Sequence, residues 1–199
     1  QLYMLQTRQG KRTPQATARI ALDLLDEGLI DLDEARRRTA TLQADQLRTT
    51  HVVSADGQAL SPQAHAASAC TGVAIGEIAL DAERAQTRHS DGIPVILVRR
   101  DADTGDIAAL AHAQGLLTAR GARTSHAAVV ARHMGKVCLV GCPELQIDEA
   151  QRSVNLGGLI LQEGDTLTLD GNEGVIYVGA ARTEVDEPTE LLNRLARLR

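Results

Sequence analysis

The chain has 199 residues, enough for one domain with attached segments or for two small domains. It contains no Trp, no Phe and 2 Tyr, so an aromatic platform for stacking bases or sugars is not expected. The net charge is −5, and the Arg residues are interspersed with acidic residues rather than gathered in a basic stripe. Nucleic-acid binding is therefore disfavoured.

Three cysteines, Cys70, Cys138 and Cys142, are too few for a disulfide scaffold in a chain of this length. We expect reduced, mostly buried thiols in a cytoplasmic protein, and no metal site. No apolar run approaches the roughly 20 residues of a membrane span, and no signal peptide is recognisable. Because Gln1 is not an initiator residue, we expect the chain to be a segment of a longer protein.

The first 50 residues predict a strand end followed by a helical hairpin. A short strand is expected at 2–7. Thr13 and Pro14 are typical of a helix start, with a hydroxyl at the N-cap and Pro at the first helical position. That helix should end near Gly28, and a second should begin near Asp31.

Residues 51–68 are polar and rich in Ala and Ser, which predicts an irregular linker. An alternation of short strands and helices follows, typical of an α/β domain. Strands are expected at 73–80, 94–98, 116–118 and 137–140, and helices at 105–113, capped by Thr104, and at 125–134.

The end of this domain, near 182, is expected to be all β. Strands at 159–161, 166–169 and 175–178 are separated by turn residues, and the last two form a hairpin pattern. The charged tail, 183–199, carries four Leu at helical spacing and predicts a linker helix that needs a packing partner.

The most informative stretch is 121–132, with the sequence GARTSHAAVVAR. Gly121 permits a tight turn after a strand, and Thr124 and Ser125 are good N-cap residues. His126 is therefore expected in the first turn of a helix. The amide N–H groups there lack intrahelical partners, so they favour a phosphate group, and Arg132 could contact its oxygens. This pattern is compatible with a phosphoryl-carrying histidine, although a histidine near a helix start is more often a solvated or capping residue.

These twelve residues resemble the phosphohistidine signature of the phosphoenolpyruvate-utilising enzymes. That family contains pyruvate phosphate dikinase, phosphoenolpyruvate synthase and Enzyme I of the sugar phosphotransferase system. Segments 95–99, 115–121, 134–136, 140–142 and 163–165 are similar to the dikinase branch in order and spacing, as is the opening, 4–13.

The resemblance implies a compact, swivelling β/β/α phosphohistidine domain at 51–182. It would follow the end of a nucleotide-binding domain and a helical linker (1–50) and precede a linker helix (183–199). His126 would carry a phosphoryl group from ATP towards pyruvate. ATP, Mg²⁺ and the pyruvate-binding barrel would belong to absent domains of a homodimeric enzyme. Thr124 matches a threonine that a regulatory kinase/phosphatase modifies in dikinases.

Several alternatives stay open at this point. The domain could come from a synthase or an Enzyme I-like protein, or it could be a stand-alone phosphocarrier. It could also be a structural domain with a relic histidine, which a buried His126 would favour. Simple packing, solvation or turn formation is the expected role of the remaining polar candidates, which are Cys138, Cys142, His112, His133, Arg100, Asp165 and Asp170.

Overall fold

The computed structural model describes residues 12–54 and 61–198, and the chain divides into two compact units. Unit 1 contains the described residues of 1–49 and 185–199, and unit 2 is Thr50–Glu184. The strand expected at 2–7 lies outside the described residues.

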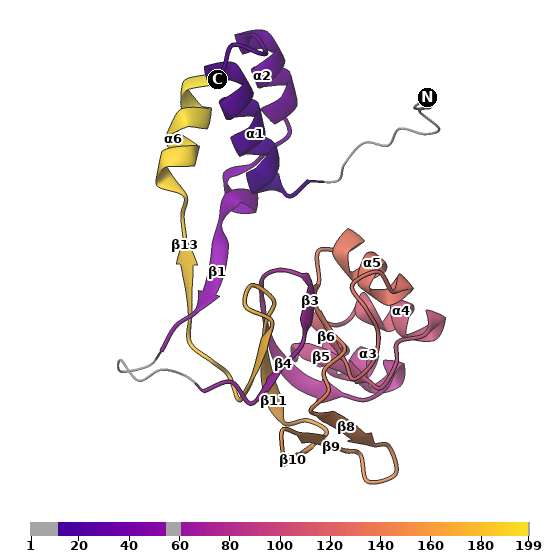
Figure 1. Cartoon of the computed structure of the whole chain (residues 1–199). Coiled ribbons are helices and arrows are strands. Elements are labelled where there is room, and N and C mark those ends of the chain that lie inside the picture. The colour runs from indigo at the N-terminus through magenta and orange to yellow at the C-terminus, as the bar shows by residue number, and fades with distance from the viewer. Residues whose placement is uncertain (1–11, 55–60, 199) are drawn as a thin grey trace, which may run out of the picture. The chain divides into compact units, whose positions relative to one another are not determined.

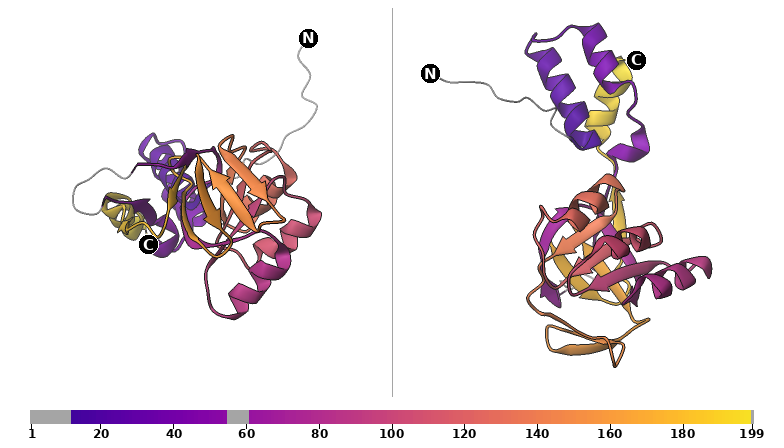
Figure 2. Two further views of the ribbon diagram at one scale, coloured as in Figure 1. Left: turned by 90° about the horizontal axis from the view of Figure 1, so that it is seen from below. Right: turned by 90° about the vertical axis from the view of Figure 1, so that its right-hand side faces the viewer.

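Unit 1 is helical. Its elements are α1 (Pro14–Asp26), α2 (Leu32–Thr39), the 3₁₀ helix η1 (Ala44–Leu47) and α6 (Thr189–Leu198). The predicted caps are confirmed, because the Thr13 side chain accepts a hydrogen bond from the Ala16 N–H and Asp31 accepts one from the Glu34 N–H. Figure 2 shows α1, α2 and α6 side by side.

The tail helix has its partner within unit 1. Leu191, Leu195 and Leu198 of α6 are buried in one cluster with Ala18 and Leu22 of α1. The tail, which the sequence predicts to be a linker helix, therefore belongs to the same unit as the N-terminal helices, because its leucines are buried against α1.

Residues 51–68 are expected to be irregular, and this expectation is wrong for the parts of the segment that form strands. They contribute to β1 (Thr49–Val52), β2 (Ala64–His65) and β3 (Ala67–Cys70). Each of these strands pairs with a strand distant in sequence: β1 with β13 (Thr183–Asp186), β2 with β12 and β3 with β7. Such pairing does not depend on local propensity, so composition alone did not indicate it.

The centre of unit 2 is an eight-stranded sheet with the order β2-β12-β11-β4-β5-β6-β7-β3. The four strands β4 to β7 are parallel to one another, and the others pair antiparallel. Its further strands are β4 (Val73–Ala79), β5 (Val95–Arg99), β6 (Gly115–Thr118), β7 (Val137–Val140), β11 (Thr166–Asp170) and β12 (Val175–Val178). The predicted β11–β12 hairpin is confirmed.

Three helices cover one face of this sheet, α3 (Ala82–Ser90), α4 (Thr104–Leu110) and α5 (His126–His133). Figure 1 shows them gathered together within unit 2. Small side chains such as Ala85, Ala109 and Ala128 pack against strand residues such as Leu97 and Leu116. Because these contacts are made by Ala, the helices can approach the sheet closely, which offsets the lack of large aromatic side chains.

A second, three-stranded sheet covers the other face, with the order β10-β9-β8. Its strands are β8 (Leu145–Asp148), β9 (Ser153–Leu156) and β10 (Leu159–Gln162). Leu156 and Leu161 share a buried cluster with Ile96, Val98 and Leu117 of the large sheet. The fold is therefore α/β with a β/β/α layer order, and the predicted fold class is confirmed.

One local expectation needs correction, and some elements were missed. Asp103, not Thr104, is the N-cap of α4, and its side chain accepts hydrogen bonds from the N–H groups of Gly105 and Asp106. Helix α3 and strands β8 and β9 were not predicted. In α3 only Ala85 is buried, so the helix shows little apolar periodicity along the sequence.

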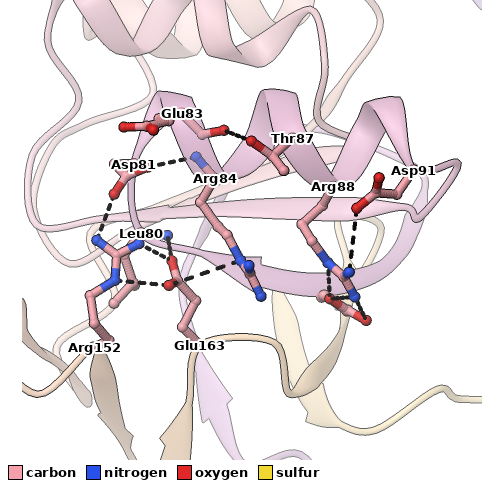
Figure 3. Close-up of polar contacts among 10 residues, drawn as sticks. Leu80, Asp81, Glu83, Arg84, Thr87, Arg88, Asp91, Arg152 and Glu163 are labelled. Atoms are coloured by element: carbon pink, nitrogen blue, oxygen red, sulfur yellow. Dashed lines mark hydrogen bonds and ion pairs between the residues drawn. The ribbon is translucent and has the colours of Figure 1, made fainter.

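A charge network holds the C-terminal end of β4 (Figure 3). Arg152 donates to both carboxylate oxygens of Glu163 (Nε–Oε2 2.8 Å, Nη2–Oε1 2.6 Å) and to Oδ2 of Asp81 (2.5 Å). Glu163 also accepts from the Leu80 N–H at 2.9 Å. Burial alone would raise the pKa of Asp81, but hydrogen bonds from the Arg84 N–H and the Arg152 guanidinium outweigh it, so the pKa is lowered.

Candidate functional site: the histidine loop at the sheet edge

The candidate site lies where the parallel strands end. Strands β5, β6 and β7 run in the same direction, so their C-terminal ends share one edge of the sheet. The loop 119–125, here called the histidine loop, leaves β6 at this edge and leads into α5. Open α/β sheets commonly place their ligands outside this edge.

Hydrogen bonds and a close contact between backbone segments hold the histidine loop in place. The Thr118 hydroxyl donates to the Arg120 carbonyl at 2.6 Å, and the Ser125 N–H donates to the Ala122 carbonyl at 2.8 Å. Gly121 has a φ of +110°. Gly141, just after β7, has a φ of +66°, and a Cβ there would lie 2.9 Å from the Gly121 carbonyl oxygen. A glycine at 141 therefore lets the two chain segments come close.

Helix α5 begins at His126, as predicted. The Ser125 hydroxyl accepts a hydrogen bond from the Ala128 N–H at 3.3 Å and so caps the helix. The His126 side chain is exposed, whereas Ala127 and Ala128 are buried at 4% and 0% exposure against the sheet. The helix is thus anchored by its small residues and presents the imidazole to solvent. A buried His126, which would favour a relic histidine, is not observed.

The first turn of α5 can hold an anion beside the imidazole. In any α-helix the first N–H groups have no intrahelical carbonyl partner, and here Ser125 occupies only that of Ala128. The positive end of the helix dipole adds about 0.3–1 kcal/mol in favour of a bound anion. The arrangement can therefore stabilise a phosphoryl group carried by His126.

The side chain of Thr124 is exposed to solvent, whereas that of Arg132 is hydrogen-bonded to the backbone. Thr124 is exposed in the turn before the cap, and in the described part of the chain its hydroxyl has no hydrogen-bond partner. Arg132 donates through Nε to the Ala69 carbonyl (2.9 Å) and through Nη2 to the Arg123 carbonyl (3.2 Å). It therefore ties the histidine loop to β3, a structural role that sequence reasoning did not anticipate.

The two other candidate histidines, His112 and His133, make contacts outside the histidine loop. His133 ends α5, and its Nδ1 lies 2.9 Å from the Val129 carbonyl oxygen. The His112 ring lies 5.1 Å from the ring of His89, between centroids. Neither contact brings these rings to the histidine loop.

The remaining polar candidates make local contacts. Arg100 donates through Nη2 to the Ile147 carbonyl at 3.3 Å. Asp165 and Asp170 stabilise turns by accepting hydrogen bonds from the N–H groups of Gln162 and Asn172. The pKa of Cys142 is raised to about 11, chiefly by burial.

Gly141 is the residue of this site that sequence reasoning left without a role. Its signal was the glycine directly after a buried strand, which often marks a close approach of two backbones. Within 12–54 and 61–198, no group of three or more His, Cys, Asp or Glu residues could hold a metal ion. The helices in the same ranges are all too short or too polar to cross a bilayer.

Comparisons with known proteins agree with the resemblance drawn from the signature. Residues 93–174, which include the histidine loop and α5, match the family described as PEP-utilising enzyme, mobile domain. The resemblance to the phosphoenolpyruvate-utilising enzymes is thereby confirmed.

Among curated proteins, the chain is similar to pyruvate, phosphate dikinases. It is 44% identical over 183 residues to that of Clostridium symbiosum, covering 92% of this chain and 21% of the relative. The chloroplastic dikinase of Flaveria pringlei is 39% identical over 178 residues, covering 89% and 19%. The chain thus spans about a fifth of the length of these relatives.

A solution structure of Enzyme I overlaps 53% of this chain and 36% of its own at 24% identity, with a TM-score of 0.31. This similarity is too low to support any conclusion about function.

Proposed function

We propose that this chain, which resembles the mobile domain of the phosphoenolpyruvate-utilising enzymes, is the phosphoryl-carrier part of a pyruvate phosphate dikinase-type transferase. The overall reaction would convert ATP, phosphate and pyruvate into AMP, diphosphate and phosphoenolpyruvate. The observation that carries the proposal is the exposed His126 at the first position of α5, directly after a capped loop at the sheet edge.

The proposed chemistry at His126 consists of three successive transfers. An imidazole nitrogen attacks the β-phosphorus of ATP and breaks its bond to the oxygen that bridges it to the α-phosphorus, so that a pyrophosphoryl group is bonded to His126 and AMP leaves. One phosphoryl group then passes to inorganic phosphate, which becomes diphosphate. Pyruvate loses a proton from its methyl group to become an enolate, the second phosphoryl group moves to the enolate oxygen, and His126 is regenerated. The N–H groups of the first turn of α5 stabilise the negative charge on the histidine throughout.

The other participants lie outside the chain in this proposal. ATP with Mg²⁺ and pyruvate would be bound by separate domains of a homodimeric enzyme, and the carrier would move between them. Thr124 is a candidate for regulation because it is exposed two residues before His126. A phosphate on Thr124 adds a charge of about −1.5 to −2 and would compete for the same helix-end N–H groups.

The test supplies the nucleotide-binding domain and ATP labelled at its β-phosphate, and follows acid-labile, base-stable label on the chain. His126→Ala should abolish the label. His133→Ala is the matched control, because His133 is a second exposed histidine of the same helix and should leave labelling intact. Label that survives in the His126→Ala protein would refute the proposal.

A synthase-type enzyme or a stand-alone phosphocarrier are the alternatives. A dikinase requires inorganic phosphate as a co-substrate and releases diphosphate. The products formed by the full-length protein therefore distinguish a dikinase from a synthase-type enzyme. The length of the parent gene product distinguishes a multidomain enzyme from a stand-alone phosphocarrier, since a stand-alone carrier would be close to the size of this chain.

A further inference from the structure

Two cysteines face each other across the edge of the large sheet. Cys70 of β3 and Cys138 of β7 are directly opposite partners in an antiparallel pair. Directly opposite residues project to the same face of a sheet. Accordingly, Cys138 belongs to the cluster beneath the helices, and Cys70 packs against that cluster. All three cysteines of the chain are free thiols in this structure.

The spacing of such a pair is close to that of a disulfide. Opposite residues in antiparallel strands have Cα atoms roughly 4.5–5.5 Å apart, and disulfides span about 4.4–6.8 Å. Their Cβ atoms, at about 4.5–5.5 Å, need to approach by at most about 1 Å to reach disulfide geometry. The strand pair can supply this movement. β3 is the terminal strand of the sheet, and its register shifts between Ser68 and Cys70.

The C-x3-C pair visible in the sequence does not have this arrangement. Cys142 belongs to the cluster on the opposite face of the large sheet, beneath the three-stranded sheet. The left-handed backbone of Gly141 turns the chain between the two residues. Cys138 therefore has Cys70, and not Cys142, as its neighbouring thiol.

We propose that Cys70 and Cys138 are an oxidation site, which closes to a cross-strand disulfide when a low-molecular-weight disulfide oxidises it. The Cys70 thiolate attacks one sulfur of the oxidant, whose S–S bond breaks and releases one thiol. Cys138 then loses its proton to solvent and attacks the Cys70 sulfur, releasing the second thiol. The protein loses two electrons and two protons, and the oxidant is reduced to two thiols.

Burial assigns the order of attack. Cys70 is half-buried and reachable from solvent, whereas Cys138 is 0% exposed and can serve only as the second, resolving thiol. Burial raises the pKa of the Cys70 thiol, and the charge of Arg132 partly offsets this effect. Burial, and then the neighbouring Cys70, raise the pKa of Cys138 to about 12. The closing step should therefore be slow at neutral pH and faster in alkaline buffer.

The disulfide would cross-link β3 and β7, the two strands against which α5 packs. Helix α5 packs against both β3 and β7. Its Arg132 is already hydrogen-bonded to the carbonyl of Ala69, next to Cys70. A cross-link there should raise the thermal unfolding temperature of unit 2, because it restricts the unfolded chain between two distant residues.

The experiment equilibrates the folded chain with mixtures of reduced and oxidised glutathione and measures its intact mass and free thiols. We expect a loss of about two daltons, reversed by dithiothreitol. Tryptic peptides 49–84 and 137–152 should become joined. The Cys142→Ala variant is the decisive one, because peptide 137–152 also contains Cys142. It should still form the joined pair, and Cys70→Ser should not.

The folded state should also favour closure over the unfolded chain. The equilibrium fraction of disulfide in Cys142→Ala protein is measured against the glutathione ratio, in native buffer and in concentrated urea. The effective concentration of the two thiols derived from it should be at least about tenfold higher in native buffer than in urea. Far-UV circular dichroism of Cys70→Ser is the control for folding, and it should match the spectrum of the unsubstituted chain. Equal closure in native buffer and urea, or two free thiols in Cys142→Ala protein at every glutathione ratio, would overturn the proposal.

Discussion

Replacing Gly141 by Ala tests whether the end of β7 sets the position of the histidine loop. The φ of +66° would strain any residue with a Cβ by about 1–2 kcal/mol. The added Cβ would also lie 2.9 Å from the Gly121 carbonyl oxygen, a backbone atom that cannot rotate away. Overpacking of this kind costs about 1–3 kcal/mol. We therefore expect a total loss of about 2–5 kcal/mol in the free energy of unfolding.

Gly135→Ala is the matched control for this prediction. Gly135 has a φ of +65°, but a Cβ there would have nothing within 4 Å. Its replacement should cost only the backbone strain, about 1–2 kcal/mol. Urea unfolding of the two variants measures the difference, and labelling of His126 by phosphoramidate reports on the loop. Labelling should slow in Gly141→Ala and not in Gly135→Ala. Equal losses of stability in the two variants would refute the reasoning.

Three further predictions concern the loop and the charge network. Ser125→Ala should lower the free energy of unfolding by about 1 kcal/mol, because the cap of α5 is lost, whereas Thr124→Ala should change it by less than about 0.5 kcal/mol. Urea titrations check both, and equal effects would contradict the assignment of the cap. Thr124→Glu should slow phosphoramidate labelling of His126 by charge repulsion, with Thr124→Gln as the neutral control; similar rates for the two would speak against the proposed switch. The lowered pKa of Asp81 means that the unfolded chain binds its proton first as pH falls. The stability it contributes is present above about pH 4 and lost as pH falls through its folded pKa, so Asp81→Asn, which keeps the helix cap, should flatten the acid limb of stability against pH. If the free energy of unfolding falls equally steeply at acidic pH in both proteins, the Asp81 carboxylate does not contribute to the pH dependence of stability.

Elements with local signals could be predicted from the sequence. Thr13 and Asp31 mark helix starts because a cap involves residues only three apart. Runs such as 95–98 are recognisable because strands buried on both faces are continuously apolar. Helix α3 was missed because it is polar and only Ala85 is buried. Strands β1 to β3 were missed because their stability comes from partners far along the chain.

Much of the candidate site could also be predicted, because its signals lie in neighbouring residues. The position of His126 at a helix start followed from the hydroxyl residues before it and the small residues after it. Which hydroxyl caps the helix did not follow, because Thr124 and Ser125 are equally suitable caps in sequence. The tether between Arg132 and Ala69 joins residues 63 positions apart and has no sequence signature.

The sequence by itself determined the α/β class, the histidine at the start of a helix and the resemblance to the phosphoenolpyruvate-utilising enzymes, because each depends on neighbouring residues. Only the tertiary structure decided which strands are adjacent. It placed Gly141 against the histidine loop, α6 among the N-terminal helices and Cys70 opposite Cys138. The physical reason is that strand order and helix packing are set by the burial of apolar surface over the whole chain, and a given residue pattern is compatible with many such pairings.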